Sequence, residues 1–442
     1  MEKMLKYISD NLSWKVISFS AMIVLGAVLV SSCEEEDGIP LESPSGEAAV
    51  HYIRVPAPES GDSLIVKGNL GTTLAIVGEN LGGTREVWFN DRPAVISPSW
   101  VTNRTVFVSV PNLAPLNVTD KLYLINGAGD TLAHDFEVTI PAPEVLSARN
   151  EWPQAGEALI INGDFFFDVE GEVPVVVDFT GGVQSTAEVV NQNQLSVPIP
   201  TGAQEGPVTV TTNFGTTESP FHIWDSRNII LNFDDPAKSG NGFRTGLNEN
   251  SNNPINGNYC VVRWDGLDAY ERNEGSNGGA SPLMMEYKGW RANLVDPSIG
   301  PGNFYDGLYS DYALKFEAQV VTWSSGYLHL CPSAFNHGNE DGGQGGSNQE
   351  VWSNNANRRA YWGPWEETGE TFTTDGSWIT VVVPLTEFIY HRGDDGEMEE
   401  AAIKFDENAF GSMSTWMIGS AESDPATPFE FYFDNMRVVP IE

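Results

Sequence analysis

The chain has 442 residues, which corresponds to about three domains of ordinary size. Its composition is globular, with 40% hydrophobic and 19% charged residues, and its 44 Gly and 27 Pro favour turns over long helices, which indicates an all-β fold. The formal net charge of −38 argues against nucleic acid, polyanionic substrates and acidic membrane surfaces, because each of these needs clustered cations. Neutral or cationic partners remain, although a dispersed acidic balance is also consistent with solubility alone.

The N-terminus reads as an export signal. Three lysines precede the apolar run "VISFSAMIVLGAVLV", and small residues follow it directly before Cys33. This order is typical of a secretory signal, and the run is too short to favour a transmembrane helix. The segment "LVSSC" resembles the lipobox of bacterial lipoproteins, which implies that residues 1–32 are removed and Cys33 is lipidated. The following "EEED" resembles the acidic export tag of surface-exposed lipoproteins in Bacteroidota, although a solvated acidic spacer has the same composition. Residues 33–50 are predicted to be an acidic tether.

One pattern then occurs twice, about 85 residues apart. Its first copy includes Gly71, Leu74, Ile76, Gly78 and Asn80, and its second copy includes Gly156, Leu159, Ile161, Gly163 and Asp164. The period suits a small sandwich rather than a solenoid repeat, and the alternation in "TVFVSV" and "PVTVTT" predicts antiparallel strands. These motifs resemble the IPT/TIG family of immunoglobulin-like domains. The resemblance implies two such β-sandwiches, over residues 51–140 and 141–224, which are expected to act as spacers.

The sequence changes beyond Trp224, and eight of the 13 Trp lie after residue 225. Strand-like runs there are "NIILNFDD", "NYCVVRW", "DYALKFEAQVV", "GYLHLC", "SWITVVVPL", "TWMIGS" and "FEFYFDNMRVV". They predict a third antiparallel sandwich of a jelly-roll kind over residues 225–442, and its end strands resemble those of carbohydrate-binding jelly rolls. Cys260 and Cys331 lie in two of these runs, which favours buried free thiols, although an oxidising exterior also allows a disulfide.

The whole arrangement resembles the surface glycan-binding lipoproteins of Bacteroidota, whose C-terminal domain is named for xyloglucan binding. This resemblance implies a non-catalytic protein at the cell surface, lipid-anchored in the outer membrane. Its ligand would be a neutral polysaccharide such as a β-glucan, a xyloglucan or a mannan. Its partner would be an outer-membrane glycan transporter complex, formed by a TonB-dependent transporter and its lipoprotein lid. No nucleic-acid partner and no cofactor are implied.

Candidate contact residues for the glycan are aromatic. Sugar rings expose a face of C–H bonds, and a flat aromatic ring buries that face without needing charge. In "RRAYWGPWEE" the rings follow neither a strand nor a helix period, and the neighbours are charged, which indicates a contact surface. The adjacent Tyr361 and Trp362 resemble the Tyr-Trp pair of the glycan platform in xyloglucan-binding relatives. Trp365, Trp352 and Trp323 are expected to extend the platform, Trp323 because it continues the polar side of its strand. Trp378 and Trp416 lie in apolar runs and are expected in the core.

Acidic residues interrupt the first and last strands of the third domain. They are Asp234 and Asp235, after "IILNF", and Asp434, within "FEFYFDNMRVV". In the jelly rolls that these strands resemble, the first and last strands lie together and such residues often hold calcium, which hard oxygen ligands suit. The alternative interpretation is that these aspartates belong to turns or cap hydrogen bonds.

Two other classes of function remain open. A sandwich-fold glycosidase needs two carboxylates held across the scissile bond, and the abundance of acids makes a chance pair uninformative. The chain has no strand with the Glu-x-Asp-x-x-Glu pattern of sandwich β-glucanases and no G-x-S-x-G motif. A surface adhesin or structural stalk could use the same exposed rings to bind protein.

Overall fold

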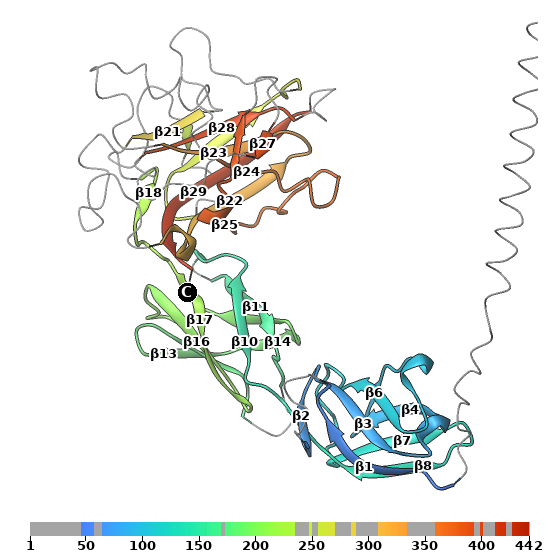
Figure 1. The fold of residues 1–442 in the computed structure, drawn as a ribbon. Coiled ribbons are helices and arrows are strands. Elements are labelled where there is room, and N and C mark those ends of the chain that lie inside the picture. The colour runs from blue at the N-terminus through green and yellow to red at the C-terminus, as the bar shows by residue number, and fades with distance from the viewer. Residues whose placement is uncertain are drawn as a thin grey trace, which may run out of the picture. The chain divides into compact units, whose positions relative to one another are not determined.

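The computed structural model forms two compact units, which divide between Pro141 and Ala142 (Figure 1). The structure describes residues 46–56, 64–154, 156–168, 173–234, 247–249, 255–269, 284–288, 308–333, 359–392, 398–400, 412–420 and 427–441. The predicted signal, tether and Cys33 lie outside these residues. Among the described residues, no helix has the length and apolar character needed to cross a bilayer.

The first unit is a sandwich of β-sheets, as the sequence predicted. One sheet has the order β1-β3-β6, the other has the order β5-β4-β7-β8, and β2 and β9 form a separate short parallel pair. The strands are β1 (Ala49–Arg54), β2 (Lys67–Asn69), β3 (Thr73–Glu79), β4 (Thr84–Phe89), β5 (Arg92–Ala94), β6 (Thr105–Ser109), β7 (Lys121–Asn126), β8 (Thr131–Asp135) and β9 (Glu137–Thr139), with 3-10 turns η2 (Leu81–Gly83) and η3 (Pro98–Trp100).

The second unit begins with another sandwich, of orders β10-β11-β15-β14 and β13-β12-β16-β17. Its strands are β10 (Glu144–Ala148), β11 (Ala158–Asp164), β12 (Val176–Phe179), β13 (Val183–Thr186), β14 (Glu188–Asn191), β15 (Gln194–Pro198), β16 (Gly206–Thr212) and β17 (Gly215–Ile223). A single cluster of buried side chains from both sheets, including Leu159, Val177 and Phe221, fills its interior.

The repeated glycines have the same structural cause in both sandwiches. A Cβ added to Gly78 would lie 1.9 Å from the carbonyl oxygen of Ala49, and one added to Gly163 would lie 1.9 Å from that of Glu144. Each glycine faces a β-bulge in the neighbouring strand, β1 or β10, where two backbones approach closely. The glycine recurs in the sequence because the neighbouring strand leaves no room for a side chain at this position.

The rest of the second unit is a larger sandwich. One sheet has the order β19-β20-β29-β22-β25, with β18 also paired to β29, and the facing sheet has the order β21-β28-β23-β24. Its strands are β18 (Ile229–Leu231), β19 (Leu247–Glu249), β20 (Tyr259–Trp264), β21 (Met284–Lys288), β22 (Tyr312–Thr322), β23 (Tyr327–Ser333), β24 (Ala360–Trp362), β25 (Ile379–Pro384), β26 (Tyr390–Arg392), β27 (Met398–Glu400), β28 (Ser412–Ile418) and β29 (Phe429–Pro440), with 3-10 turns η5 (Tyr309–Asp311) and η6 (Leu385–Glu387).

The main core of this sandwich lies between its two sheets. Phe316, Phe431 and Phe433 come from the larger sheet, and Leu330 and Met417 come from the smaller one. The first and last strands pair, as the resemblance implied, through Ile229 opposite Arg437 and Leu231 opposite Met436. Every strand-like run predicted from the sequence is a strand, whereas β19, β21, β24, β26 and β27 are too short or too polar to stand out.

Two further predictions about single side chains can be compared with this core. Cys260 is buried and free, in agreement with the favoured interpretation, and burial raises the pKa of its thiol above the usual range. Trp378 is buried, as expected, but in a smaller cluster with Tyr259 and Val261 that lies apart from the main core. The side chains of Cys331 and Trp416 lie outside the described residues.

Candidate functional site

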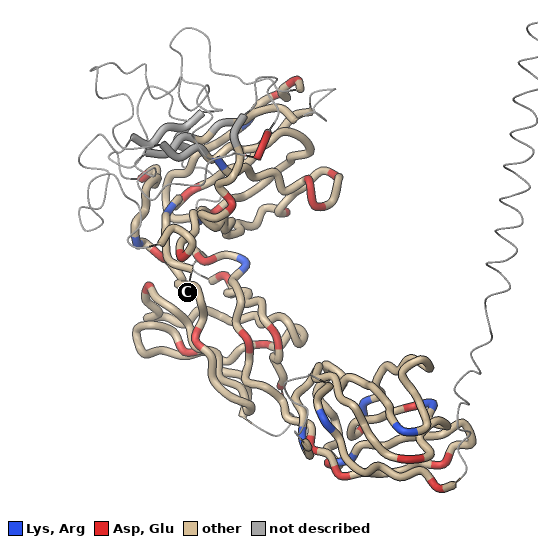
Figure 2. The backbone as a smooth tube through the Cα atoms, in the orientation of Figure 1, with Lys and Arg blue, Asp and Glu red and all other residues tan. Residues whose placement is uncertain are grey.

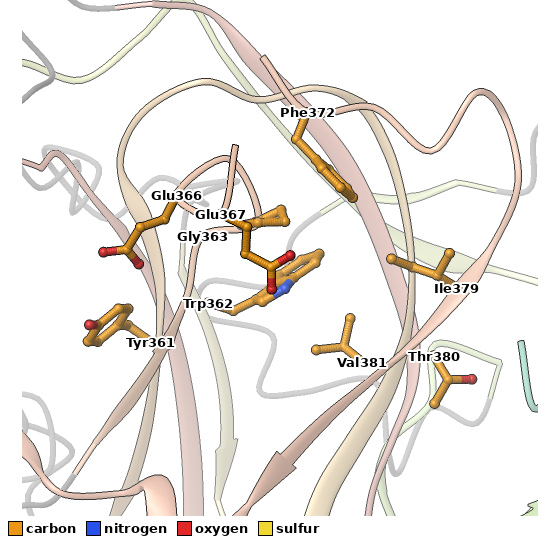
Figure 3. Close-up of a pocket in the computed structure, with 10 residues that line it drawn as sticks. Tyr361, Trp362, Gly363, Glu366, Glu367, Phe372, Ile379, Thr380 and Val381 are labelled. Carbon is orange, nitrogen blue, oxygen red and sulfur yellow. The ribbon is translucent and has the colours of Figure 1, made fainter. Parts of the chain in front are cut away.

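A cleft of about 570 Å³ opens where the edge strands β24 and β25 of the two facing sheets lie beside each other. β24 and the turn after it line one side, and Ile379, Thr380 and Val381 of β25 line the other, with Phe372 above them (Figure 3). The short segment "AYW" thus forms an edge strand, paired with β23 through His329 opposite Tyr361. Sequence reasoning placed a turn and a contact surface here, and the turn at Gly363-Pro364 begins directly after the strand.

Trp362 is the central ring of the cleft (Figure 3). It is half-buried, because its ring packs edge-on against Phe316, with centroids 5.4 Å apart, and against Trp323, with centroids 5.1 Å apart. Such T-shaped pairs are favourable arrangements that fix ring orientation. One part of the indole therefore anchors in the core while the rest borders the cleft.

Tyr361 lies at the rim and points to the other side of β24, since successive side chains of a strand alternate. Its ring contacts Tyr327 and Tyr390, with centroids 4.8 Å and 5.0 Å apart. Burial raises the pKa of the Tyr361 phenol to about 12, and the neighbouring Tyr390 and Glu366 add to the shift. The phenol is therefore uncharged at neutral pH and can both donate and accept a hydrogen bond.

The turn after β24 shapes the cleft wall. A Cβ added to Gly363 would lie 2.5 Å from Cδ1 of Tyr327, so only glycine allows this turn to pass so close to that ring. The carboxylates of Glu366 and Glu367 are exposed on the same wall (Figure 3). Aromatic and aliphatic faces with a few peripheral polar groups suit a neutral ligand that carries many hydroxyls.

The structure corrects the predicted position of Trp323. Its side chain is 0% exposed and stacks on Phe431, with centroids 4.4 Å apart, so it offers no ring face to a ligand. The cause is a β-bulge at Val321, where two residues of β22 oppose one of β29. This extra residue reverses the alternation of the strand and turns Trp323 from the polar side, where the sequence predicted it, to the core.

Trp365 is also buried, with 8% of its surface exposed, and its Nε1 donates a hydrogen bond to the carbonyl oxygen of Gly326 at 2.8 Å. It supports the turn from behind and does not line the cleft. Trp352 and Asp235 lie outside the described residues. Among the five aromatic candidates, the structure therefore brings Tyr361 and Trp362 together at the cleft.

Sequence reasoning missed the β25 side of the cleft. Ile379, Thr380 and Val381 belong to the run "SWITVVVPL", which was predicted as a strand, and no property of the run identifies it as an edge. Phe372 likewise lies in an undistinguished polar stretch. Phe372 lies at the mouth of the cleft because its backbone pairs with that of Trp323 in an isolated β-bridge. This tertiary contact cannot be read from the sequence.

The acidic residues at the first and last strands are partly described. Asp434 is fully buried; its Oδ1 accepts a hydrogen bond from the backbone N–H of Asn435, and its Oδ2 has no partner among the described residues. Asp234 is exposed, and its Oδ1 accepts the backbone N–H of Asn258 at 2.7 Å. Burial raises the pKa of Asp434 well above its usual range, and the nearby Glu317 and Asp234 charges add to this. The described residues contain no cluster of three His, Cys, Asp or Glu side chains placed to hold a metal.

Taken together, two immunoglobulin-like sandwiches and a larger sandwich with an aromatic edge cleft define a class of modular all-β proteins. Residues 223–440 match the family described as the surface glycan-binding protein B xyloglucan binding domain, and this part of the chain belongs to that family. An IPT/TIG domain-containing protein of Bacteroides ovatus is 28% identical over 179 residues, which are 38% of this chain and 34% of the relative. The chain thus spans about a third of the length of this curated relative.

One solved structure has a similar fold over most of this chain. The crystal structure of the surface glycan-binding protein PbSGBP-B from Prevotella bryantii is similar with a TM-score of 0.64 and 26% identity, and the match covers 90% of this chain and 100% of that one. An SGBP-B from a complex xyloglucan utilization locus in Bacteroides uniformis is 19% identical, with a TM-score of 0.46 and coverage of 89% and 100%.

Proposed function

We propose that this chain is a non-catalytic, cell-surface polysaccharide-binding lipoprotein that captures a neutral glycan in the cleft between β24 and β25. The observation that carries this proposal is the position of Trp362, a ring fixed in the core at one edge and bordering an open cleft in a domain of the glycan-binding family. The ligand class is a β-glucan, xyloglucan-like or mannan chain.

The chemistry of the cleft supports a neutral chain over a charged one. Trp362, Phe372 and the aliphatic side chains of β25 offer surfaces for the C–H faces of sugar rings, worth about 1–3 kcal/mol per well-buried ring. Glu366, Glu367 and the uncharged Tyr361 phenol can accept hydrogen bonds from hydroxyl groups. Asp and Glu positions outnumber Lys and Arg along the described backbone (Figure 2), which disfavours a polyanion.

The remaining parts of the proposal follow from the sequence. Lipidation of Cys33 would anchor the protein in the outer membrane, and the acidic tether would lead to the cell surface. A TonB-dependent transporter with its lipoprotein lid would receive the captured glycan. Membrane contact would be through the lipid alone, with no nucleic-acid partner.

The test is a screen of polysaccharides in native gels. Xyloglucan, mixed-linkage β-glucan and mannan are each cast into a gel, with polygalacturonate as the charged control, and released reducing sugar is measured in parallel. We expect retardation by at least one neutral polysaccharide, none by polygalacturonate, and no released sugar. Released sugar would make the protein a glycosidase, and the absence of both effects would favour an adhesin or stalk.

We also propose a structural calcium ion at the junction of β18 and β29, with Asp434, Asp234 and Asp235 as carboxylate ligands. The buried Oδ2 of Asp434 supports this, because a buried carboxylate oxygen that accepts no hydrogen bond is costly unless the group is protonated or binds a cation. The calcium ion would link the first and last strands of the domain and would not contact the glycan. A protonated Asp434 is the competing interpretation.

A further inference from the structure

The outer face of the larger sheet, away from the main core, carries charged side chains that are shielded from solvent. Lys315 and Glu317 of β22 and Arg437 of β29 are buried, although their strand positions put them on the side that the sequence marks as polar. Buried charges are costly unless they are paired and hydrogen-bonded. Their partner is a segment of the preceding immunoglobulin-like sandwich.

The segment is residues 149–152, between β10 and β11, and Glu151 is its centre. One carboxylate oxygen of Glu151 accepts a hydrogen bond from Lys315 Nζ at 2.7 Å, and the other accepts one from Arg437 Nη2 at 2.7 Å. Arg437 also donates to both carboxylate oxygens of Glu317, at 2.9 Å and 3.0 Å. Lys315 and Arg437 thus share the carboxyl groups of Glu151 and Glu317, and every one of these side chains is at most 7% exposed.

The same segment holds the edge strand β25. The backbone N–H of Glu151 donates to Oγ1 of Thr380 at 2.7 Å, and that hydroxyl donates to Glu317 at 3.1 Å. The backbone N–H of Thr380 donates to the carbonyl oxygen of Arg149 at 2.9 Å. Trp152 packs against the small apolar cluster that contains Trp378, just before β25. Thr380 is therefore hydrogen-bonded to this segment, and Thr380 and its neighbours Ile379 and Val381 also line the cleft.

We infer that residues 149–152 support the cleft. Glu151 and Thr380 are positioning residues that fix β25, one of the two cleft walls, against the preceding sandwich. An edge strand has a hydrogen-bonded partner on one side only, and here β22 is that partner. The segment supplies bonds on the other side. The second immunoglobulin-like sandwich therefore does more than set the distance between the cleft and the membrane anchor. The effect on glycan affinity rests on the proposed function, but the effect on β25 does not.

The inference is tested by hydrogen exchange and affinity measurements on the full mature chain. Thr380→Val keeps the shape of the side chain but removes the bridging hydroxyl, and Glu151→Gln keeps the shape of the carboxylate but removes its charge. Thr380→Ser keeps the hydroxyl, and Glu188→Gln removes an exposed carboxylate in the same sandwich as a control. Exchange is compared between peptides from β25 and from β28, and binding is measured with the polysaccharide that the gel screen identifies.

We expect Thr380→Val and Glu151→Gln to speed exchange in β25 at least tenfold, to leave β28 unchanged, and to weaken polysaccharide binding severalfold. Thr380→Ser should retain the protection of β25, and Glu188→Gln should behave as the wild type. Unchanged exchange in β25, or an equal rise in β25 and β28, would overturn the inference. A wild-type protein that binds no polysaccharide would refute the proposed function alone, because exchange in β25 is read without a ligand.

Discussion

Trp362 has two roles because of where it lies in β24. Its inner edge contacts Phe316 and Trp323, and its outer part borders the cleft, so a change at this residue affects both stability and binding. We predict that Trp362→Ala weakens polysaccharide binding at least tenfold, or about 1.4 kcal/mol, measured by isothermal titration calorimetry. The lost packing should also lower the free energy of unfolding by about 1–3 kcal/mol, less than for a fully buried ring.

The control for this prediction uses the tryptophans that are not exposed in the cleft. Trp323→Phe and Trp365→Phe should lower the melting temperature but leave affinity within about twofold, since their rings lie in the core or behind the turn. If Trp365→Phe weakened binding as much as Trp362→Ala does without unfolding the protein, the site would lie elsewhere than in this cleft.

Glu317 makes stability depend on pH. Burial raises the pKa of its carboxyl to about 7, against the pull of Arg437, so the folded state binds a proton that the unfolded state releases near its usual pKa. This contribution is fully present below the unfolded pKa and is lost as the pH rises through about 7. A shift of this size corresponds to about 3 kcal/mol. Arg437, Glu151, Thr380 and Asp434 are the groups that act on it.

We therefore predict that the wild type unfolds at a higher temperature at pH 5.5 than at pH 8, and that Glu317→Gln reduces this difference. Thermal unfolding followed by circular dichroism at both pH values is the measurement. The variant should also be less stable overall, because Arg437 loses one of its two carboxylate partners. An unaltered pH dependence in the variant would show that Glu317 is ionised throughout this range.

At the scale of elements, the repeated glycine in β3 and in β11 of the two small sandwiches governs how closely two strands can pack. Gly78→Ala would place a Cβ 1.9 Å from the carbonyl oxygen of Ala49 and must displace β1. We predict a loss of about 1–3 kcal/mol in the unfolding free energy of the first unit. Gly82→Ala is the matched control, because its nearest new contact is 3.5 Å and its effect should be small. Equal effects of both changes on denaturant midpoints would contradict this explanation.

At the junction of β18 and β29, Asp434 either binds calcium or is a neutral acid, and a chelator can distinguish these two interpretations. If calcium is bound there, a chelator should lower the melting temperature, with a larger effect at pH 8 than at pH 5.5, because a ligand carboxylate must be ionised. Asp434→Asn should remove that effect and leave the polysaccharide preference unchanged. If Asp434 is instead a neutral acid, the chelator should have no effect and Asp434→Asn should be tolerated, since Asn resembles the protonated form in shape.

At the scale of the whole molecule, the proposed location can be tested on cells. A lipid on Cys33 would bury its acyl chains in the membrane and so hold the protein there. We predict that intact cells bind antibody against the protein, that external protease removes it, and that Cys33→Ala releases it from the membrane fraction. Ser32→Ala, which keeps a small residue before the cysteine, is the control and should remain membrane-bound. Protection from protease in intact cells would place the protein on the inner side of the outer membrane.

Much of this architecture could be predicted because it depends on local patterns. The all-β fold follows from Gly and Pro frequency and from alternation, and the twofold repeat follows from residues such as Gly78 and Gly163, where an added Cβ would lie 1.9 Å from a neighbouring carbonyl oxygen. The adjacent Tyr361 and Trp362 stood out because large rings between charged residues break the strand period. Each of these signals is contained within a few consecutive residues.

The tertiary structure alone decided which rings and charges face outward. A single bulge at Val321 turns Trp323 into the core. The local sequence does not predict this bulge, because it depends on the register of β22 with β29. The alternation of Lys315 and Glu317 with apolar residues marked a polar face correctly but could not reveal that Glu151, 164 residues before Lys315, covers it. Sequence fixes the period of a strand, whereas exposure depends on which distant segment packs against it, and that is a property of the folded chain.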